Sequence, residues 1–327
     1  MAHTRLYRNG ILEREGFPAE EISDLIADPT ATVWLDYETP SAADLAQIAE
    51  ELSLHPLAVE DAVHEHQRPK LDRYDTHLFL AAYAIQAQQA EATGEHELRT
   101  MEVCAFITKQ ALVTVRKSSA FPLAAVLERW EAQSALAQYG AAYLLWGVLD
   151  AVVDSHFAAA QSLDDDVESL EDAVLAQNPD IGGVQRRSFR LRKDIMMLRR
   201  YALPMREVVG SLSRRDTEII SAELTPYFQD VYDHVLRVAD WSESLRDLVG
   251  TILDTNLTNQ SNRMNLVMKK VTSWAAIIAV PTLITGYFGQ NLAFPLFGSA
   301  VGWWVSNGLI VACSLALYLQ FKRRDWL

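Results

Sequence analysis

Polar and small side chains recur along one line of the segment 247–289, where a helix would place them on a single face. Steps of four and three residues from Asp247 reach only polar residues, glycines, alanines and one methionine. This period is the one at which helices pack around a common axis. We call these residues the polar seam: Asp247, Thr251, Asp254, Thr258, Ser261, Asn265, Met268, Thr272, Ala275, Ala279, Thr282, Gly286 and Gly289.

A packed helix seam normally carries apolar residues, so a polar one points to a different use. Because this seam continues into an apolar segment, it indicates a lumen that several copies of the chain share. Close helix packing through small residues in a bilayer is the alternative. That alternative explains Ala275 and Ala279, but it explains Asp254 and Asn265 poorly.

The apolar segment that must position the seam extends over residues 271–321 and contains no Asp, Glu, Lys or Arg. It divides into two predicted spans, 271–288 and 301–321, each of a length that crosses a bilayer. The predicted external loop, 289–300, contains Pro295 and turn-forming residues, and tryptophans flank both spans as in interfacial belts. A buried hairpin of a large soluble protein is the alternative, but the rest of the chain offers little surface to cover it.

Basic residues flank this hairpin on one side only. Lys269 and Lys270 precede the first span, a basic tail (322–327) follows the second, and the loop has no basic residue. The positive-inside rule therefore predicts a multi-pass protein of the plasma membrane with both termini in the cytoplasm.

The rest of the chain is acidic. The 327 residues carry a net charge of −14, which argues against nucleic acid as a partner. Cys104 and Cys313 lie far apart, so neither a disulfide framework nor a cysteine zinc site is indicated. The sequence contains no phosphate-binding glycine loop, nucleophile elbow or HExxH motif, and we expect no enzyme.

The residues before the hairpin predict an α+β domain with long stalk helices. Strands are expected at 33–37, 77–85, 101–108 and 111–116, and short helices at 18–27, 41–53 and 56–65. From residue 120 onward the pattern is helical, with long runs at 141–175, 184–212 and 227–288. We therefore expect a cytoplasmic domain at 1–225 and a stalk helix at 226–270.

Several motifs in this order resemble the CorA family of divalent-cation channels. They are 54–61 (LHPLAVED), 67–70 (QRPK), 74–75 (YD), 198–200 (LRR), 204–207 (PMRE), 226–234 (PYFQDVYDH), 265–269 (NLVMK) and 286–291 (GYFGQN). The resemblance implies a homopentamer with a cytoplasmic funnel, in which the first spans line the pore and the second spans surround them.

The resemblance also implies roles for residues of the pore. Gly289, Gln290 and Asn291 occupy the place of the family's Gly-Met-Asn signature, a selectivity filter that binds hydrated Mg²⁺ through neutral oxygens. The resemblance places Asp254, Asn265, Met268, Ala279 and Thr282 along the pore, and all five belong to the polar seam. Gln290 departs from the signature, and the loop lacks the acidic residue that many members carry.

Regulatory metal sites are implied in the cytoplasmic domain, where carboxylates of adjacent subunits would share Mg²⁺ or another divalent cation. The resemblance assigns them to Asp61 and Asp230, with Glu60, His66, Asp164 and His234 at a neighbouring site. Separately, an acidic run at 164–172 and a basic run at 186–193 are expected to pair between helices.

Three function classes remain open from the sequence. The first is a gated Mg²⁺ channel that also admits Co²⁺ or Ni²⁺. The second is a zinc transporter of the same fold, with or without proton coupling. The third is a membrane-anchored scaffold without a pore, against which the polar seam argues.

Overall fold

The computed structural model describes residues 3–64, 67–89, 96–176, 180–215, 219–290 and 299–327. The strands are β1 (His3–Arg8), β2 (Ile11–Glu15), β3 (Ala31–Glu38), β4 (Lys70–Arg73), β5 (Leu78–Gln89), β6 (His96–Ile107) and β7 (Ala111–Arg116). The α-helices are α1 (Ile22–Ile26), α2 (Ala42–Glu51), α3 (Pro56–Val63), α4 (Leu123–Ala132), α5 (Ala141–Leu175), α6 (Ile181–Arg215), α7 (Thr225–Phe288) and α8 (Ala300–Arg323). Two short 3-10 helices are η1 (Ala19–Glu21) and η2 (Ser134–Tyr139).

The chain forms two compact units, Met1–Thr251 and Ile252–Leu327. The boundary falls inside α7, because the N-terminal part of this helix packs within the first unit. The expected division into a cytoplasmic domain at 1–225 and a stalk helix at 226–270 stays a prediction.

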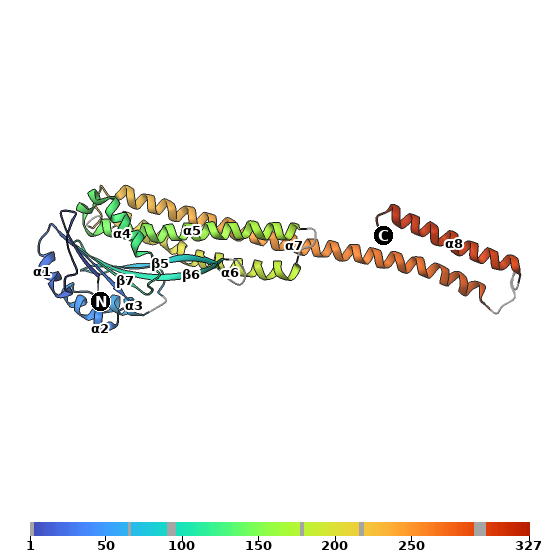
Figure 1. Cartoon of the computed structure of the whole chain (residues 1–327), viewed down its shortest axis with the longest axis horizontal. Coiled ribbons are helices and arrows are strands. Elements are labelled where there is room, and N and C mark those ends of the chain that lie inside the picture. The colour runs from blue at the N-terminus through green and yellow to red at the C-terminus, as the bar shows by residue number, and fades with distance from the viewer. Residues whose placement is uncertain (1–2, 65–66, 90–95, 177–179, 216–218, 291–298) are drawn as a thin grey trace. The chain divides into compact units, whose positions relative to one another are not determined.

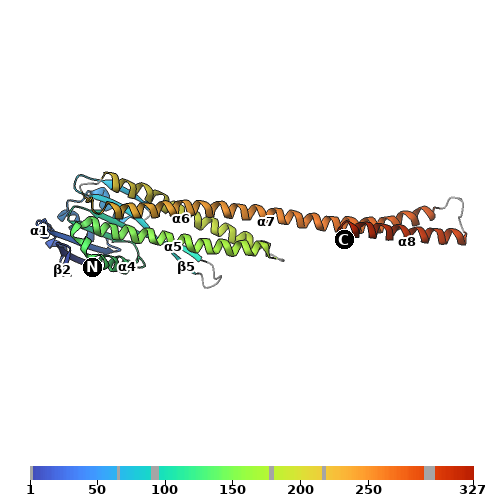
Figure 2. The same cartoon turned by 90° about the horizontal axis from the view of Figure 1, so that it is seen from above.

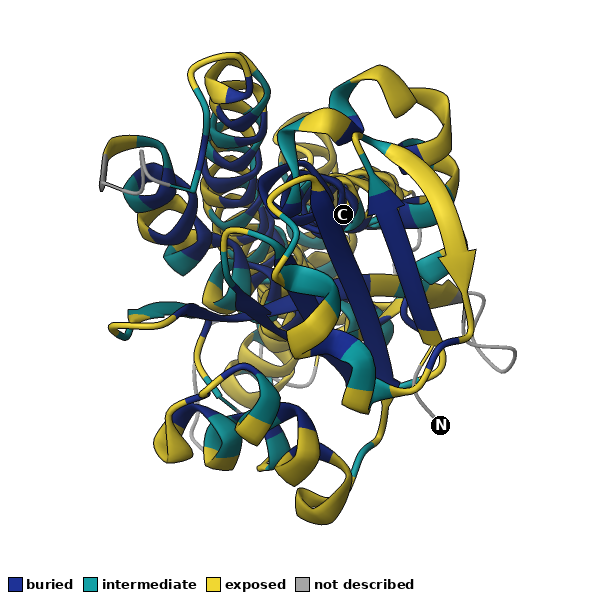
Figure 3. Cartoon of the chain, turned by 90° about the vertical axis from the view of Figure 1, so that its left-hand side faces the viewer, coloured by how far each residue is buried: buried dark blue, intermediate teal, exposed yellow. Residues whose placement is uncertain are grey.

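A seven-stranded sheet in the order β2-β1-β3-β7-β6-β5-β4 forms the centre of the first unit. β3 and β7 pair in parallel, and the other neighbours pair antiparallel. The central strands are buried on both faces, which is why their sequences read as almost continuous apolar runs. Figure 3 shows these strands as buried beside an exposed edge.

Helices cover both faces of the sheet. One face packs with α2 and α3 in a core that includes Phe79 and Phe106. The other face packs with α4, α5 and the adjoining parts of α6 and α7, in a core that includes Trp34 and Tyr143. Figure 1 shows α1, α2 and α3 on the side of the sheet opposite α4 and α5.

The helices α5, α6 and the first part of α7 form a bundle (Figures 1 and 2). Most of their inward positions are aliphatic, for example Leu163, Leu198 and Val235, although Ser188 and Asp194 of α6 are also buried. α6 begins at Ile181 and continues through Pro204. The glycines 182 and 183 therefore lie in its first turn, and the helix begins three residues before the expected run at 184–212.

In the second unit, α8 folds back along the C-terminal part of α7 (Figures 1 and 2). Both helices are long and apolar enough to cross a membrane, and only 6% of each apolar window is buried. Large side chains such as Ile278, Leu283 and Trp304 are exposed along both helices. This hairpin agrees with the two predicted spans.

Candidate metal centre and ion pathway

One cluster of metal-ligating groups forms among the described residues of the first unit. Asp150 on α5 lies beside Asp230 and His234 on α7, and the ligand atoms of the three side chains all lie within 4.8 Å of one another. Asp230 is exposed and the other two are half-buried. Two carboxylates and one imidazole in this arrangement can hold a divalent cation.

The local sequence explains how the cluster forms. Asp230 and His234 are four residues apart on α7, so they lie on one helix face. Phe228, Val231 and Val235 bury the adjoining face of α7 in the core that also contains most of the first half of α5. That packing brings the α7 pair against Asp150.

The electrostatics of Asp150 agree with a partly buried ligand. Burial raises the pKa of its carboxyl group, and the charge of Arg129 works in the opposite direction. The Nε atom of Arg129 lies 2.8 Å from Asp150, and its Nη2 atom lies 2.6 Å from Asp154. The guanidinium group of Arg129 therefore fixes the position of the Asp150 carboxylate. Asp230 and His234 lie beside the same carboxylate.

Asp150 was not among the metal ligands predicted from the sequence, although its position in the sequence is unusual. It is the only charged residue in the apolar stretch 141–153, which is the part of α5 buried against the sheet. Asp164 was predicted with His234 for the neighbouring regulatory site. Asp164 lies 14 residues further along α5, about 21 Å away at the rise of a helix, and the cluster does not include it.

The other predicted regulatory residues lie on or near α3. Glu60 is exposed and Asp61 is half-buried on this helix, and His66 lies outside the described residues. Lys70 lies 2.6 Å from Asp61 and 2.7 Å from Asp72. The Nζ atom of Lys117 donates to the carbonyls of Ala62 and Val63 and so holds the end of α3 on the sheet. Within a single chain, the described cluster around Asp230 does not include Glu60 or Asp61.

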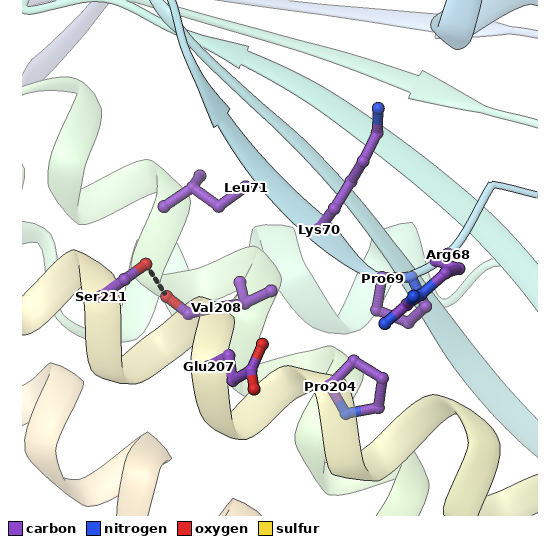
Figure 4. A pocket seen from close by; sticks show the side chains of 8 residues that line it. All are labelled: Arg68, Pro69, Lys70, Leu71, Pro204, Glu207, Val208 and Ser211. Carbon is purple, nitrogen blue, oxygen red and sulfur yellow. Dashed lines mark hydrogen bonds between the residues drawn. The ribbon is translucent and has the colours of Figure 1, made fainter.

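A cavity of about 430 Å³ lies between β4 and α6 (Figure 4). Arg68, Lys70 and Glu207 line it, but Figure 4 shows the Lys70 side chain directed away from Glu207. The Lys70 amine is engaged by Asp61 and Asp72. The polar groups of this cavity therefore do not converge on a common ligand position.

Every residue of the polar seam is exposed in the single chain. Thr258 and Thr282 donate their hydroxyl hydrogens to the carbonyls of Asp254 and Ile278, at 2.9 and 3.0 Å. Their oxygen lone pairs therefore remain free to accept from water or to face a cation. Asp240 and Asp233, both exposed, extend the spacing of Asp247 and Asp254 by two further steps of seven.

The seam lies opposite the packed face of the second unit. Ser273 is buried, and Ile277, Val280 and Ile284 are partly buried at the same helical spacing. At 100° per residue, this face lies across the helix from Ala275, Ala279 and Thr282. Gly289 and Gln290 are exposed at the end of α7, and Asn291 lies outside the described residues.

The comparisons with known proteins agree over nearly the whole chain. The family model described as CorA-like Mg²⁺ transporter protein matches residues 30–323. The cobalt/magnesium transport protein CorA of Thermotoga maritima is 31% identical over 303 residues, which cover 92% of this chain and 85% of that protein. The zinc transport protein ZntB of Yersinia pestis is 28% identical over 318 residues, which cover 93% of this chain and 90% of that protein.

Solved structures share the fold. The CorA magnesium transporter of Methanocaldococcus jannaschii superposes with a TM-score of 0.76 at 21% identity, covering 100% of this chain and 99% of that chain. The full-length CmaX protein superposes with a TM-score of 0.72 at 19% identity, covering 98% and 96%. Since the family model and a 31% identical relative both cover more than four fifths of the sequence, the chain belongs to the CorA-like Mg²⁺ transporter family, a family of membrane ion transporters and not of enzymes.

Proposed function

We propose that five copies of the chain surround a common axis and conduct divalent metal cations across the plasma membrane. The observation that carries the proposal is the polar seam, which is exposed along α7 and lies opposite the packed face of the second unit. Inside the predicted span 271–288 the seam carries the hydroxyls of Thr272 and Thr282 beside small residues, and just before the span it carries the amide of Asn265. Such a polar face is less favourable against lipid than against water. It becomes favourable when it lines water shared by several copies.

In such a ring each seam residue occurs once per subunit. Asn265 and Thr282 would provide rings of neutral oxygens, and Met268 a ring of thioethers between them. Mg²⁺ loses its water reluctantly, so neutral rings that bind the hydrated ion suit it. Gly289, Gln290 and Asn291 would form the filter at the outer mouth.

The cluster of Asp150, Asp230 and His234 is the proposed site of regulation by cytoplasmic cations. A bound ion would offset the repulsion between its carboxylates and favour one arrangement of the acidic domains. Asp61 of an adjacent copy would complete a shared site with Asp230, and Glu60, His66 and Asp164 remain candidates for a second regulatory site. The loss of these ions at low cytoplasmic Mg²⁺ would open the constriction at Met268.

The first candidate cargo is Mg²⁺ with Co²⁺, since the Thermotoga relative at 31% identity is named a cobalt/magnesium transport protein. Zn²⁺ is the second candidate. It is favoured by the match to ZntB, by the imidazole in the cluster, and by Gln290 in place of the signature methionine.

Flux into liposomes that contain the purified full-length chain tests the proposal. Mg²⁺, Co²⁺, Ni²⁺ and Zn²⁺ are compared side by side, with and without a proton gradient, and we expect Mg²⁺ and Co²⁺ to enter faster than Zn²⁺. Faster, gradient-dependent Zn²⁺ entry would establish the second candidate. If none of the four ions enters, the chain is a scaffold and the pore proposal fails.

Orientation is tested in whole cells after both native cysteines are replaced by serine. Ala300→Cys should react with an impermeant maleimide added outside the cells, because the loop lacks basic residues. A cysteine at Ala2 should react only after the cells are opened. The reverse pattern would overturn the proposed topology.

A further inference from the structure

Lys70 on β4 pairs with two carboxylates, and one of them belongs to the proposed regulatory site. Its Nζ atom lies 2.6 Å from Oδ2 of Asp61 and 2.7 Å from Oδ2 of Asp72. The ring centroid of Phe79 lies 5.6 Å from the same amine. The side chains of Lys70 and Asp61 are only 30% and 27% exposed, so water screens this ion pair less than it screens a pair on the open surface.

The two faces of β4 explain why the lysine meets Asp61. Lys70 and Asp72 are two residues apart and lie on one face of the strand, and Leu71 between them lies on the other. Leu71 packs against the core that contains α5, whereas Phe79, which pairs with Asp72 across the strands, packs in the core that contains α3. Lys70 and Asp72 therefore face α3, the helix that carries Asp61. Figure 4 agrees, since the Lys70 side chain is directed away from α6.

The end of α3 and residue Gln67 are both fixed on the sheet beside this pair. The ammonium group of Lys117 donates to two backbone carbonyls at the end of α3. The hydroxyl of Tyr83 donates to the carbonyl of Gln67. Because both points are anchored, Asp61 has little freedom to swing away from Lys70 when a cation approaches.

We propose that Lys70 is a tethered competitor of the divalent cation at Asp61, and that it sets the cation concentration at which the regulatory site fills. The proposal rests on the regulatory role of Asp61 proposed above. Among the described residues, the carboxylate of Asp61 forms its hydrogen bond and its ion pair with Lys70 alone, through Oδ2. A cation bound to the other oxygen would lie within about 7 Å of the ammonium group, since Mg²⁺ binds oxygen at about 2.1 Å.

Charge repulsion determines the size of this competition. In water, a dication and an ammonium group about 7 Å apart repel by an amount that weakens binding about five- to tenfold. Asp72 shares the amine, so the three side chains together carry one negative charge. Without the lysine, Asp61 and Asp72 would present two. In the gating scheme proposed above, Lys70 would therefore keep the site empty at low cation concentration and delay closure of the pore.

A purely structural role for Lys70 predicts the opposite effect on binding. If the lysine only held the carboxylate of Asp61 in a position that suits the cation, its loss would weaken ion binding. If it competes, its loss strengthens ion binding, and the gain falls as salt rises because salt screens the two positive charges from each other. The sign of the change and its salt dependence therefore separate the two roles.

Thermal unfolding of the full-length protein in detergent tests the competition. Mg²⁺ is titrated after bound metal has been removed with EDTA, and the readout is the Mg²⁺ concentration that gives half of the rise in Tm. We expect Lys70→Gln to lower this midpoint about fivefold or more in about 20 mM salt, and about twofold or less in about 300 mM salt. Lys70→Arg keeps the charge and should stay within about twofold of the parent.

Two controls show whether the effect passes through Asp61. In the Asp61→Asn background, Lys70→Gln should change the midpoint less than about twofold, because the site has lost the carboxylate that places the ion beside the lysine. Lys109→Gln removes the same charge from an exposed position in the β6–β7 turn, at the other end of β7 from Lys117. It should leave the midpoint within about twofold of the parent.

Asp72→Asn provides a second measurement that leaves Lys70 in place. The lysine then pairs with Asp61 alone, and one negative charge beside the site is lost, so the midpoint should rise about twofold or more. A midpoint that is unchanged or lower in this variant would contradict the competition.

A midpoint for Lys70→Gln that is equal to that of the parent or higher would overturn the proposal, as would an equal shift in the Asp61→Asn background. A parent whose Tm does not respond to Mg²⁺, Co²⁺ or Zn²⁺ would overturn both the competition and the regulatory site. Cation flux in liposomes is measured separately, so a failure of the proposed pore is distinguishable from a failure of the competition.

Discussion

The substitution Asp230→Asn distinguishes a metal site from an ordinary pair of surface carboxylates. It should raise the stability of the protein when no divalent ion is present and reduce the stabilisation that a bound ion provides. Asp150 and Asp230 place ligand atoms within 4.8 Å of each other. Two unit charges at that distance repel by about 1 kcal/mol in water and by about 3 kcal/mol at an effective dielectric constant of 20. Since Asp230 is exposed, the lower figure applies.

Without divalent ions, the variant should therefore be more stable than the parent. A gain of about 1 kcal/mol corresponds to a rise in Tm of about 2–4 °C for a unit of this size. With an ion at a hundred times its Kd, the parent should gain about 2.7 kcal/mol. If the loss of one charged ligand weakens binding tenfold, the variant should gain only about 1.4 kcal/mol.

The assay is thermal unfolding of the full-length protein in detergent, first with EDTA and then across a titration of Mg²⁺, Co²⁺ or Zn²⁺. Asp233→Asn is the matched control, because Asp233 lies on the same helix and outside the cluster. An equal ion-dependent rise in Tm for the Asp230 variant and the parent would refute the assignment of the cluster as a metal site.

Three further predictions concern the filter, a buried carboxyl group and the sheet edge. Asn291→Ala should abolish selective flux in liposomes and leave the oligomer intact by native mass spectrometry, because alanine supplies no side-chain oxygen; unchanged flux would remove the filter assignment. Burial raises the pKa of Asp194 to about 6, so this group favours folding at low pH and loses that contribution as pH rises from about 4 to 6. Asp194→Asn should therefore be more stable than the parent by up to about 3 kcal/mol at pH 7.5 and similar to it near pH 4 in denaturant titrations, and an equal gain at both values would contradict the burial argument. Gly10→Ala should lower the free energy of unfolding by about 2 kcal/mol or more, because Gly10 has φ +79° and an added Cβ would lie 2.5 Å from the backbone nitrogen of Gln138; a loss below about 0.5 kcal/mol would show that the β1–β2 turn can move away.

The sheet illustrates which elements local sequence reveals. The expected strands at 33–37, 77–85 and 111–116 correspond to β3, β5 and β7, whose burial on both faces requires apolar side chains. β1, β2 and β4 were not expected. β2 and β4 are edge strands with charged residues and little apolar pattern, and β1 mixes polar, charged and apolar residues without a regular alternation.

Local sequence also reveals the long helices. The expected run at 141–175 agrees with α5, and the run at 227–288 differs from α7 by two residues at its start. Ser41 also caps α2 as its residue type suggests, with Asp44 completing a capping box. These features depend on neighbours within a few positions, and such neighbours can be read from the sequence.

The polar seam and the cluster of Asp150, Asp230 and His234 differ in how far local sequence specifies them. The polar seam depends on the period of one helix and on the absence of charge in residues 271–321, so the order of the residues is enough to recognise both. It is not enough to identify the partner of Asp230 and His234. Asp150 and Asp164 are both acidic residues of α5, and only the packing of α5 against α7 places Asp150 in reach.

Composition and period thus determine the two membrane helices, their polar face and the mixed character of the first unit, because hydrophobic burial and helix geometry act along the chain. The order of the seven strands, the position of each helix on the sheet, and the meeting of Asp150 with Asp230 come from contacts between residues far apart in sequence. Such contacts depend on how side chains of several elements fill one core together, and no single segment of the sequence carries that information.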